Sequence, residues 1–412
     1  MRIFFSGVLG AGIGPLARLA ADLGHTVYGS DAELGDAAEL TGSGATLCLG
    51  KQDGGFLREL AGSDATGIDW YVHTSALAKD HPELATARDL DLKVSKRDEL
   101  LAYLIETSGL ELVAVAGTHG KTTTSSMLAW AMYALGLPAA YIVGGAPPWG
   151  PAGSYQDGAR YFIYEADEYD RNFLAFHPWL TLITSVSWDH PDVYPTAADY
   201  YAAFEQFRAQ SRKVIEGLDA DPRATVFGAV RRIDATLAVA ALREMLPDKP
   251  EDALWAAVNS FPGVGRRSEQ LLPGLYSDHV DHPDEVVASM EIAREVASAS
   301  GFKGVAAIYQ PHQNTRQHLV RHMYRDTFAD IAVLRWLPTF LTREDPTLPI
   351  ITPEEFLAEL SGPVDRAPGK LDDTLSAEIA RLRADGYLVW TMGSGSIDGF
   401  VRAHTVNHDT GR

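Results

Sequence analysis

The stretch GTHGKTTT, residues 117–124, decides how the middle of this chain folds. It follows an apolar, β-branched run, LVAVA at 112–116, and precedes an apolar-periodic stretch, SSMLAWAMYAL at 125–135. This order predicts a strand, a glycine turn and a helix. Small glycines let backbone N–H groups close around phosphate oxygens, and the N-terminus of the helix adds its positive dipole end. Residues 117–124 are therefore predicted to cradle phosphate groups.

Two side chains of this loop have predicted roles of their own. Lys121 supplies a point charge for phosphate oxygens, and Thr122 offers a hydroxyl to Mg²⁺. The general phosphate-loop pattern requires a glycine at position 115, where this chain has Val115, so the loop is a shorter GxxGKT variant. The alternative is a Gly-Lys-Thr string that merely opens an ordinary helix, and the strand, turn and helix context disfavours it.

The composition limits the classes of protein and partner. A chain of 412 residues is predicted to form two or three domains. Its formal net charge of −20 argues against nucleic-acid and anionic-membrane partners, because both require a basic surface. Cys48 is the only cysteine, which excludes an internal disulfide and fits a reducing compartment. Since no apolar run approaches the roughly 18 residues of a membrane helix and the N-terminus lacks a signal-peptide layout, we expect a cytoplasmic protein.

The first segment of the chain begins as a βαβ unit. Strand RIFFSG at 2–7 leads into a glycine-rich turn, a helix and a second strand, HTVYGSD at 25–31. Asp31 ends the second strand, as an acidic residue does in nucleotide-binding α/β folds, although the turn GVLGAGIG is not a clean GxGxxG. The alternative interpretation is that the glycines only allow close packing of the helix.

Strands and helices alternate along the rest of the chain. The segment after the phosphate loop contains predicted strands YFIYEAD and LTLITSVSWDH and helices near 196–213, 232–245 and 250–260, and the turn-rich FPGVGRR at 261–267 ends it. The last segment contains predicted strands GLYSDH, GVAAIYQ, IAVLRWL and YLVWTMG. This alternation predicts an α/β fold with mostly parallel sheets.

Polar residues at two further strand ends are predicted to join the phosphate loop. EADEYD at 165–170, with Glu165 and Asp167, follows strand YFIY, and His190 of the string WDH follows strand LTLITSVS. Because the carboxyl ends of parallel strands share one edge of a sheet, these residues can converge with the loop. A hydroxyl, a carboxylate and a neutral imidazole can bind Mg²⁺ beside ATP phosphates, although histidine is less usual for so hard an ion. A solvated strand end and a packing histidine are the alternatives.

Six motifs in register resemble the Mur ligase family. They are GTHGKTTT, EADEYDRNFLAFHP, the DH after a strand, FPGVGRR, DHPDE and QPHQNTR, and the similarity covers nearly the whole chain. The resemblance implies three domains, each a mostly parallel sheet with helices. Residues 1–107 would form a Rossmann-like UDP-sugar domain, and residues 108–268 a P-loop ATPase-like domain for ATP. Residues 269–412 would form a Rossmann-like domain that brings in the amino acid and closes over the site.

The resemblance implies an ATP-dependent ligase that joins an amino acid to the carboxylate of UDP-N-acetylmuramate in peptidoglycan precursor synthesis. ATP would convert the carboxylate to an acyl phosphate, which the amine attacks, so the protein positions the reactants and neutralises charge. Lys121 would hold the β- and γ-phosphates, Thr122 and Glu165 would bind one Mg²⁺, and His190 would bind a second. The implied catalytic residues are Lys121, Glu165 and His190. The implied ATP contacts are Gly117, Thr118, His119, Gly120, Lys121, Thr122, Thr123 and, at the ribose, Asp278.

Contacts to the two other substrates are also expected. By match to the C-terminal motifs, the resemblance implies His312 and Arg316 at the amino-acid pocket. From their place after the first two strands, Gly10 and Gly12 are expected near the UDP diphosphate, and Ser30 and Asp31 near the uracil. Arg316 has a reason of its own, since a guanidinium binds a carboxylate bidentately. The alternative for Arg316 is a surface arginine, and that for His312 is a histidine that fixes a turn. The alternative for Ser30 and Asp31 is a plain β-turn at Gly29.

Two departures from the family pattern concern the amine-bearing substrate. The family usually carries DYxHHP where this chain has DHVDHP at 278–283, so Asp281 replaces one expected histidine. The family also carries QPHRxTR, where Gln313 replaces the first arginine. An amino acid held by an arginine pair should bind less well here, since a hydrogen bond to a charged group is worth roughly 1.5 to 3 kcal/mol. We therefore expect an amine that is not plain L-alanine, or is bound differently, such as one with an added amine or a blocked carboxylate.

A third departure concerns the adenine. The family's GxHN-type motif corresponds to GAVRRIDAT at 228–236, where His and Asn are absent, and the region at about 213–228 is shorter by a strand and helix pair. Arg231, Arg232 or Asp234 would contact the nucleotide instead, and solvated charges at a helix start are the alternative.

Two other functions remain open at this point. One is a ligase for a different amino acid or a peptide, of the murein-peptide recycling type, which the EADEYD variant favours and the short central region disfavours. The other is a non-catalytic relative that binds nucleotide or UDP-sugar. The altered adenine and amino-acid motifs favour it, and the intact set of Lys121, Thr122, Glu165 and His190 disfavours it.

Overall fold

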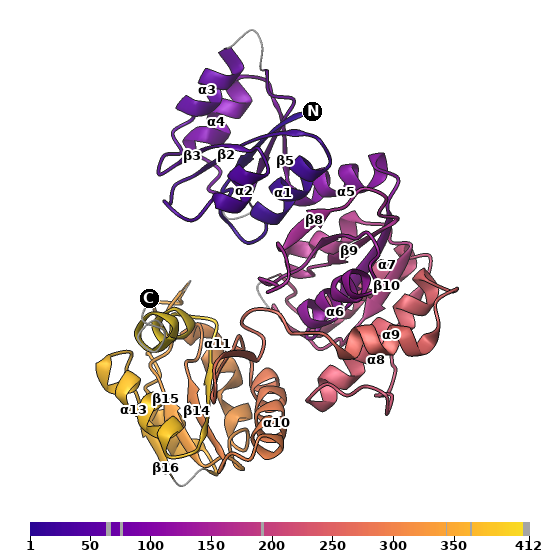
Figure 1. Cartoon of the computed structure of the whole chain (residues 1–412). Helices are drawn as coiled ribbons and strands as arrows, with labels where there is room; N and C mark the ends of the chain where they lie inside the picture. The colour runs from indigo at the N-terminus through magenta and orange to yellow at the C-terminus, as the bar shows by residue number, and fades with distance from the viewer. Residues whose placement is uncertain (63–66, 75–76, 191–192, 343, 363–364, 407–412) are drawn as a thin grey trace. The chain divides into compact units, whose positions relative to one another are not determined.

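The computed structural model describes residues 1–62, 67–74, 77–190, 193–342, 344–362 and 365–406. The described residues form three sheets, of five, six and six strands, with helices that connect many of the strands (Figure 1). Most neighbouring strands are parallel, which confirms the predicted α/β fold with mostly parallel sheets. The chain divides into two compact units, the first comprising Met1–Asp219 and Asp234–Phe261, and the second Ala220–Ile233 and Pro262–Arg412.

The first sheet has the strand order β3-β2-β1-β4-β5, and all neighbours are parallel. Its strands are β1 (Arg2–Ser6), β2 (Thr26–Asp31), β3 (Thr46–Leu49), β4 (Trp70–His73) and β5 (Lys93–Lys96). The helices of this segment are α1 (Gly14–Asp22), α2 (Ala38–Gly42), α3 (Gly55–Gly62), α4 (Pro82–Asp89) and α5 (Arg97–Thr107). The chain changes direction across the sheet between β1 and β4. Ligands of such sheets bind at the carboxyl edge of this switch point, where the glycine turn after β1 lies.

The central sheet has the order β11-β10-β6-β9-β7-β8, and only the β7–β8 pair of these described strands is antiparallel. Its strands are β6 (Glu111–Ala116), β7 (Ala140–Ile142), β8 (Gly153–Tyr155), β9 (Tyr161–Glu165), β10 (Leu180–Ile183) and β11 (Val214–Ile215). The helices are α6 (Lys121–Ala134), η1 (Tyr169–Ala175), α7 (Ala197–Gln210), α8 (Ala229–Met245) and α9 (Glu251–Asn259). Strand β6 lies inside the sheet and is buried on both faces, which explains its uninterrupted apolar sequence.

The third sheet has the order β12-β13-β17-β14-β15-β16, and β12–β13 is its antiparallel pair. Its strands are β12 (Glu269–Leu272), β13 (Leu275–Asp278), β14 (Val305–Tyr309), β15 (Val333–Trp336), β16 (Asp365–Pro368) and β17 (Leu388–Met392). The helices are α10 (Pro283–Ala299), α11 (Asn314–Val320), η2 (Arg321–Tyr324), α12 (Pro353–Glu359), α13 (Asp373–Ala384), α14 (Ile397–Val401) and η3 (Arg402–Val406). The fully buried Trp336 and Trp390 belong to the core of this sheet.

Several predicted boundaries differ from the observed ones by a few residues. The strand predicted from LTLITSVSWDH ends at Ile183, because the chain leaves the sheet before it reaches His190. Residues 216–228 form neither helix nor strand, in agreement with the shortened region inferred from the sequence. The proposed domain ranges 1–107, 108–268 and 269–412 stay a prediction. Among the described residues, none of the helices combines the length and apolar composition needed to cross a bilayer.

Candidate active site

The phosphate loop turns from β6 into α6 at the carboxyl edge of the central sheet. Gly117 has φ 142° and Gly120 has φ 86°, both in the region that favours glycine. A Cβ on Gly117 would meet the backbone O and N of Ser185 at 2.8 and 2.9 Å, and a Cβ on Gly120 would meet Oδ1 of Asp234 at 2.6 Å. Both glycines are therefore required by backbone conformation and by space.

The N-terminus of α6 is open to an anion. Among the described residues no side chain caps this helix, and its first turn contains no acidic residue. Helix α7, by contrast, begins with a complete capping box formed by Thr196 and Asp199. The uncapped N–H groups of α6 and the positive end of its dipole favour a bound phosphate.

Neighbouring residues hold the loop in shape. The Thr118 hydroxyl donates to the backbone O of Ser187 at 2.8 Å and accepts from its N–H at 2.9 Å. The backbone N–H of His119 donates to Oγ of Ser185 at 2.9 Å. Thr123 is buried in the first turn of α6. The predicted loop residues thus form one ordered turn, anchored on the segment after β10.

Lys121 is bound to an acidic residue that the sequence argument did not select. Its Nζ donates to the backbone O of Gly117 at 2.6 Å and to Oε2 of Glu168 at 2.8 Å. Glu168 is 1% exposed. Burial disfavours both charges, but their mutual attraction and hydrogen bonds outweigh it, raising the pKa of Lys121 and lowering that of Glu168. Both side chains are therefore charged, and the lysine lies against its own loop.

Thr122 and Glu165 provide the oxygen atoms expected of a magnesium site. The Thr122 hydroxyl donates to Oε1 of Glu165 at 3.1 Å, and the backbone N–H of Gly144 donates to Oε2 at 2.9 Å. A hydroxyl and a carboxylate side by side are hard oxygen donors of the kind that Mg²⁺ prefers. These two residues therefore fit Mg²⁺.

His190 reaches the same edge but lies against Glu168. Its Nε2 is 3.6 Å from Oε1 of Glu168 and 3.9 Å from Oδ2 of Asp189. Burial alone would lower the pKa of His190, but the hydrogen bond to Glu168 and the charge of Asp189 raise it. A metal-bound imidazole must be neutral, so the proton favoured here competes with metal binding. The assignment of a second Mg²⁺ to His190 stays a prediction.

The predicted UDP-sugar residues lie around the turn after β1. Helix α1 also begins without a side-chain cap from the described residues and without an acid in its first turn. Oδ2 of Asp31 accepts a hydrogen bond from the backbone N–H of Leu9 at 2.9 Å, and Gly10 starts the turn that leads into α1. A Cβ on Gly12 would collide with the Arg97 guanidinium. Arg97 was not among the predicted contacts, yet a guanidinium beside an open helix N-terminus suits a phosphate group.

Arg97 also links this turn to the EADEYD segment. Its Nε lies 3.2 Å from Oδ1 of Asp98, and its Nη2 lies 3.5 Å from Oδ2 of Asp167. Lys96, the preceding residue, pairs with Asp170 at 2.6 Å. Asp167, expected at the phosphate loop, therefore lies toward the turn after β1.

Ser30 lies in a buried polar cluster and not at a surface. It is fully buried, and its hydroxyl donates to Oε2 of Glu83 at 2.7 Å. The Ser6 hydroxyl donates to the same oxygen, and Nε2 of Gln52 lies 3.2 to 3.3 Å from both serine hydroxyls. Burial raises the pKa of Glu83 above its usual value, although the serine hydroxyls oppose the shift. Asp31 is thus the more accessible of the two predicted uracil contacts.

The variant Glu83→Gln should remove a pH dependence of stability. A carboxyl whose pKa is raised on folding stabilises the fold fully below its unfolded pKa, near 4.5, and loses that contribution as the pH rises through its folded value. The urea concentration at the unfolding midpoint of the wild type should therefore decrease as the pH rises from 4.5 through the raised pKa of Glu83. The midpoint of Glu83→Gln should decrease less over the same pH range. Glu59→Gln, an exposed change on α3, is the control. An identical pH profile in wild type and Glu83→Gln would contradict the prediction.

In the second unit, Asp278 and His312 already have partners. Asp278, at the end of β13, accepts from the backbone N–H of Ser268 at 2.9 Å, from its hydroxyl at 3.0 Å and from the Ser289 hydroxyl. The His312 ring stacks on Phe340 with centroids 5.6 Å apart. Asp278 ends β13 and His312 follows β14, so both residues lie at the carboxyl edge of the third sheet, and their assigned contacts stay predictions.

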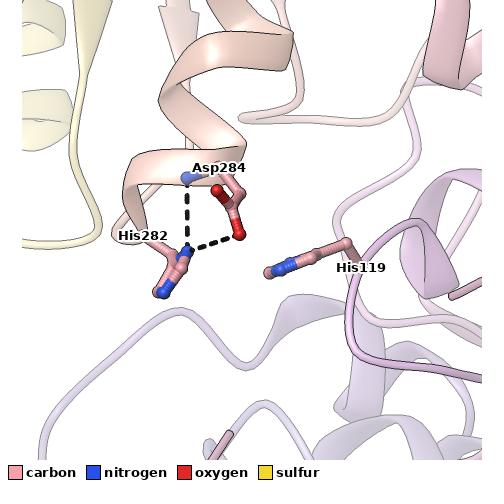
Figure 2. A group of neighbouring side chains, drawn as sticks. All are labelled: His119, His282 and Asp284. Atoms are coloured by element: carbon pink, nitrogen blue, oxygen red, sulfur yellow. Dashed lines mark hydrogen bonds and ion pairs between the residues drawn. The ribbon is translucent and has the colours of Figure 1, made fainter. Parts of the chain in front are cut away.

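Arg316 on α11 lies beside the start of α10. Its Nη1 is 3.2 Å from Oδ1 of Asp281, the residue that replaces an expected histidine. Helix α10 follows at once, and Nδ1 of His282 accepts a hydrogen bond from the backbone N–H of Asp284 at 3.2 Å and lies 3.6 Å from its carboxylate (Figure 2). His282 therefore serves as the N-cap of α10.

Of the three residues suggested as replacements for the adenine motif, one lies at the phosphate loop. Nη2 of Arg231 donates to the backbone O of Arg267 at 2.7 Å, and Arg232 forms two hydrogen bonds of 3.0 Å with Glu295. Both arginines have these contacts inside the second unit. Asp234 is buried and contacts the Gly120 position of the loop.

A pocket of about 570 Å³ lies at the opposite edge of the central sheet, near the amino ends of β6 and β10. Its lining includes Leu112, Phe176, Trp179 and Arg212, and none of the predicted site residues lines it. The charged side chains and the open N-terminus of α6 lie at the carboxyl edge of the central sheet. The pocket at the opposite edge is therefore not the candidate active site.

The fold and the loop define a class of protein, an α/β protein with a glycine loop whose helix N-terminus suits a phosphate group. The model of the Mur ligase family, catalytic domain, matches residues 2–108, and the model of the Mur ligase middle domain matches residues 115–222. The chain belongs to the Mur ligase family. The predicted family and enzyme class, an ATP-dependent ligase that forms amide bonds, are thereby confirmed.

Relatives match the chain over nearly its whole length. The UDP-N-acetylmuramate–L-alanine ligase of Streptomyces avermitilis is 31% identical over 96% of this chain and 95% of that protein. The ligase of the same name from Salinispora tropica is 30% identical over 95% of this chain and 85% of that protein. The solved UDP-N-acetylmuramate-alanine ligase of Thermotoga maritima shares the fold with a TM-score of 0.75, 21% identity and complete coverage of both chains. A murein peptide ligase of Psychrobacter arcticus gives a TM-score of 0.61 at 20% identity and 98% coverage of each.

Proposed function

We propose that this chain joins an amine-bearing substrate to the carboxylate of UDP-N-acetylmuramate at the expense of ATP, in peptidoglycan precursor synthesis. The observation that carries the proposal is the convergence of Lys121, Thr122 and Glu165 at the open N-terminus of α6. Relatives that this chain resembles over nearly their whole length are named as ligases of UDP-N-acetylmuramate and L-alanine.

The residues of the loop would act mainly by positioning and by charge neutralisation. The γ-phosphoryl group passes from ATP to the substrate carboxylate, and ADP leaves. The amine then attacks the carbonyl of the acyl phosphate, an amide bond forms and phosphate leaves. Lys121 would exchange its bonds to the Gly117 carbonyl and Glu168 for phosphate oxygens. Mg²⁺, when bound by Thr122 and Glu165, would supply positive charge beside the phosphates.

Glu168 would keep Lys121 in place when nucleotide is absent. The carboxylate is nearly inaccessible to solvent and lies 2.8 Å from the Lys121 ammonium. A bound phosphate would therefore compete with Glu168 for the Lys121 ammonium. The proposal includes a cytoplasmic location, because a chain whose single cysteine, Cys48, is free fits a reducing compartment.

The test is ADP release from ATP by the purified chain with UDP-N-acetylmuramate and a panel of amino acids and short peptides. We expect release that requires both the UDP-sugar and an amine. ADP release that needs no amine or no UDP-sugar, or binding of UDP-N-acetylmuramate without turnover for any amine, would contradict the proposal.

A further inference from the structure

The candidate carboxylate-binding arginine of the second unit is already bound to a carboxylate of the protein. Nη1 of Arg316 lies 3.2 Å from Oδ1 of Asp281, and the other oxygen of Asp281 accepts from the Ser394 hydroxyl at 3.3 Å. The two side chains are 21% and 24% exposed, so the pair lies at a surface that a small molecule can reach. A substrate carboxylate would have to displace Asp281 from Arg316.

The start of α11, which carries Arg316, offers no alternative place for a carboxylate. The backbone N–H groups of Asn314 and Thr315 donate to the two oxygens of Glu344 at 3.0 and 2.9 Å. Burial opposes the charge of Glu344, but these backbone N–H groups lower its pKa. A second internal carboxylate therefore occupies the first N–H groups of this helix.

A further carboxylate adds negative charge beside the pair. The backbone N–H of Asp281 donates to Oε2 of Glu285 at 3.1 Å. Burial and the neighbouring Tyr324 contribute most to the raised pKa of Tyr309, and the charges of Asp281 and Glu285 raise it further. A free carboxylate must compete with Asp281 for Arg316, whereas a cationic group can pair with Asp281 or Glu285 without displacing an internal carboxylate.

We propose that Asp281 determines the charge of the amine-bearing substrate. The preferred substrate carries a net positive charge, because its carboxylate is blocked as an amide or because a second amine offsets it. A zwitterionic amino acid such as L-alanine is disfavoured. This inference rests on the proposed function, since it assigns the amine site to the surface around Arg316, and it names the substrate class of that site.

Steady-state ADP release with three amines tests the inference. L-Alaninamide represents a blocked carboxylate, L-2,3-diaminopropionate an added amine, and L-alanine the zwitterion. We expect the wild type to give a higher kcat/KM with one of the cationic amines than with L-alanine. Asp281→Asn frees Arg316 and keeps an oxygen for Ser394, so it should lower the KM for L-alanine by about tenfold and weaken the preference for the cation.

Glu359→Gln is the matched control. It removes the ion pair between Glu359 and Arg321, also in the second unit but distant from Asp281 in sequence, and it should change no substrate preference. Preference of the wild type for L-alanine together with an unchanged KM in Asp281→Asn would overturn the inference.

Failure of the proposed function can be told apart from failure of the inference. If no amine supports ADP release, the proposed function fails. Calorimetric titration of the same three amines into wild type and Asp281→Asn then decides the inference without turnover. Tighter binding of L-alanine by Asp281→Asn supports it, and equal binding by both proteins overturns it.

Discussion

Replacing Lys121 by alanine should lower the rate of ADP formation by about a hundred- to a thousandfold, the effect of removing one donor aimed at developing charge. Lys121 is the cation of the phosphate loop, and its Nζ lies beside the Gly117 carbonyl at the mouth of the open helix N-terminus. Binding of UDP-N-acetylmuramate should persist, because the turn after β1 is built from other residues. Turnover by coupled ADP detection and UDP-sugar binding by calorimetry check both parts.

The same substitution has a structural side effect that the experiment must separate. Removing Lys121 leaves Glu168 charged and 1% exposed without its main partner, and breaking a buried pair costs about 3–5 kcal/mol. The double variant Lys121→Ala/Glu168→Gln removes the unpaired charge, so its urea midpoint should recover while ADP formation stays lost. Recovery of turnover in the double variant would mean that Lys121 acts on stability and not on ATP.

The central strand, turn and helix could be predicted because each has a strong local signal. β6 is buried on both faces and reads as an unbroken apolar run, and Gly117 and Gly120 occupy conformations that other residues resist. The strand ends that carry Glu165 and Asp278 follow from the same logic, since the carboxyl ends of parallel strands share an edge.

The short strands at or next to the sheet edges could not be predicted. β11 has two residues, and β7 and β8 have three each, which is too short to display a period of two. β3 and β5 lie at the edges of the first sheet, where partly polar sequences are tolerated. Their existence depends on neighbouring strands that are distant in the sequence.

The sequence also could not identify which acid of EADEYD binds Lys121. After β9 the chain leaves the sheet and forms η1, in which Asp170 and Arg171 have φ of 54° and 57°. Side chains no longer alternate between two faces there. The path of the turn after β9 therefore determines that Glu168 contacts Lys121 while Glu165 contacts Thr122. The Asp281–Arg316 pair could not be predicted either, because it joins the turn before α10 to helix α11, two segments that are distant in the sequence.

Replacing Gly117 by alanine should destabilise the fold and abolish ATP-dependent turnover. The φ of 142° opposes any side chain, and the added Cβ would meet the Thr184 hydroxyl and the backbone of Ser185 at 2.8 Å. Overpacking against backbone typically costs about 1–3 kcal/mol, and a side chain at positive φ costs about 1–2 kcal/mol more. The free energy of unfolding should therefore fall by about 2–5 kcal/mol. A displacement of about 1 Å in a loop that positions reactants can cost about a hundredfold in rate.

Gly136→Ala is the matched control because it separates strain from collision. Gly136 also has a positive φ, of 66°, but a Cβ there would meet no described atom within 4 Å. It should therefore cost only the left-handed term of about 1–2 kcal/mol and leave ADP formation unchanged. Urea unfolding and ADP formation of both variants decide the matter. Suppose that Gly117→Ala lost no more free energy of unfolding than Gly136→Ala and still turned over ATP. The loop would then accommodate a side chain at position 117, and the phosphate site would have to lie elsewhere.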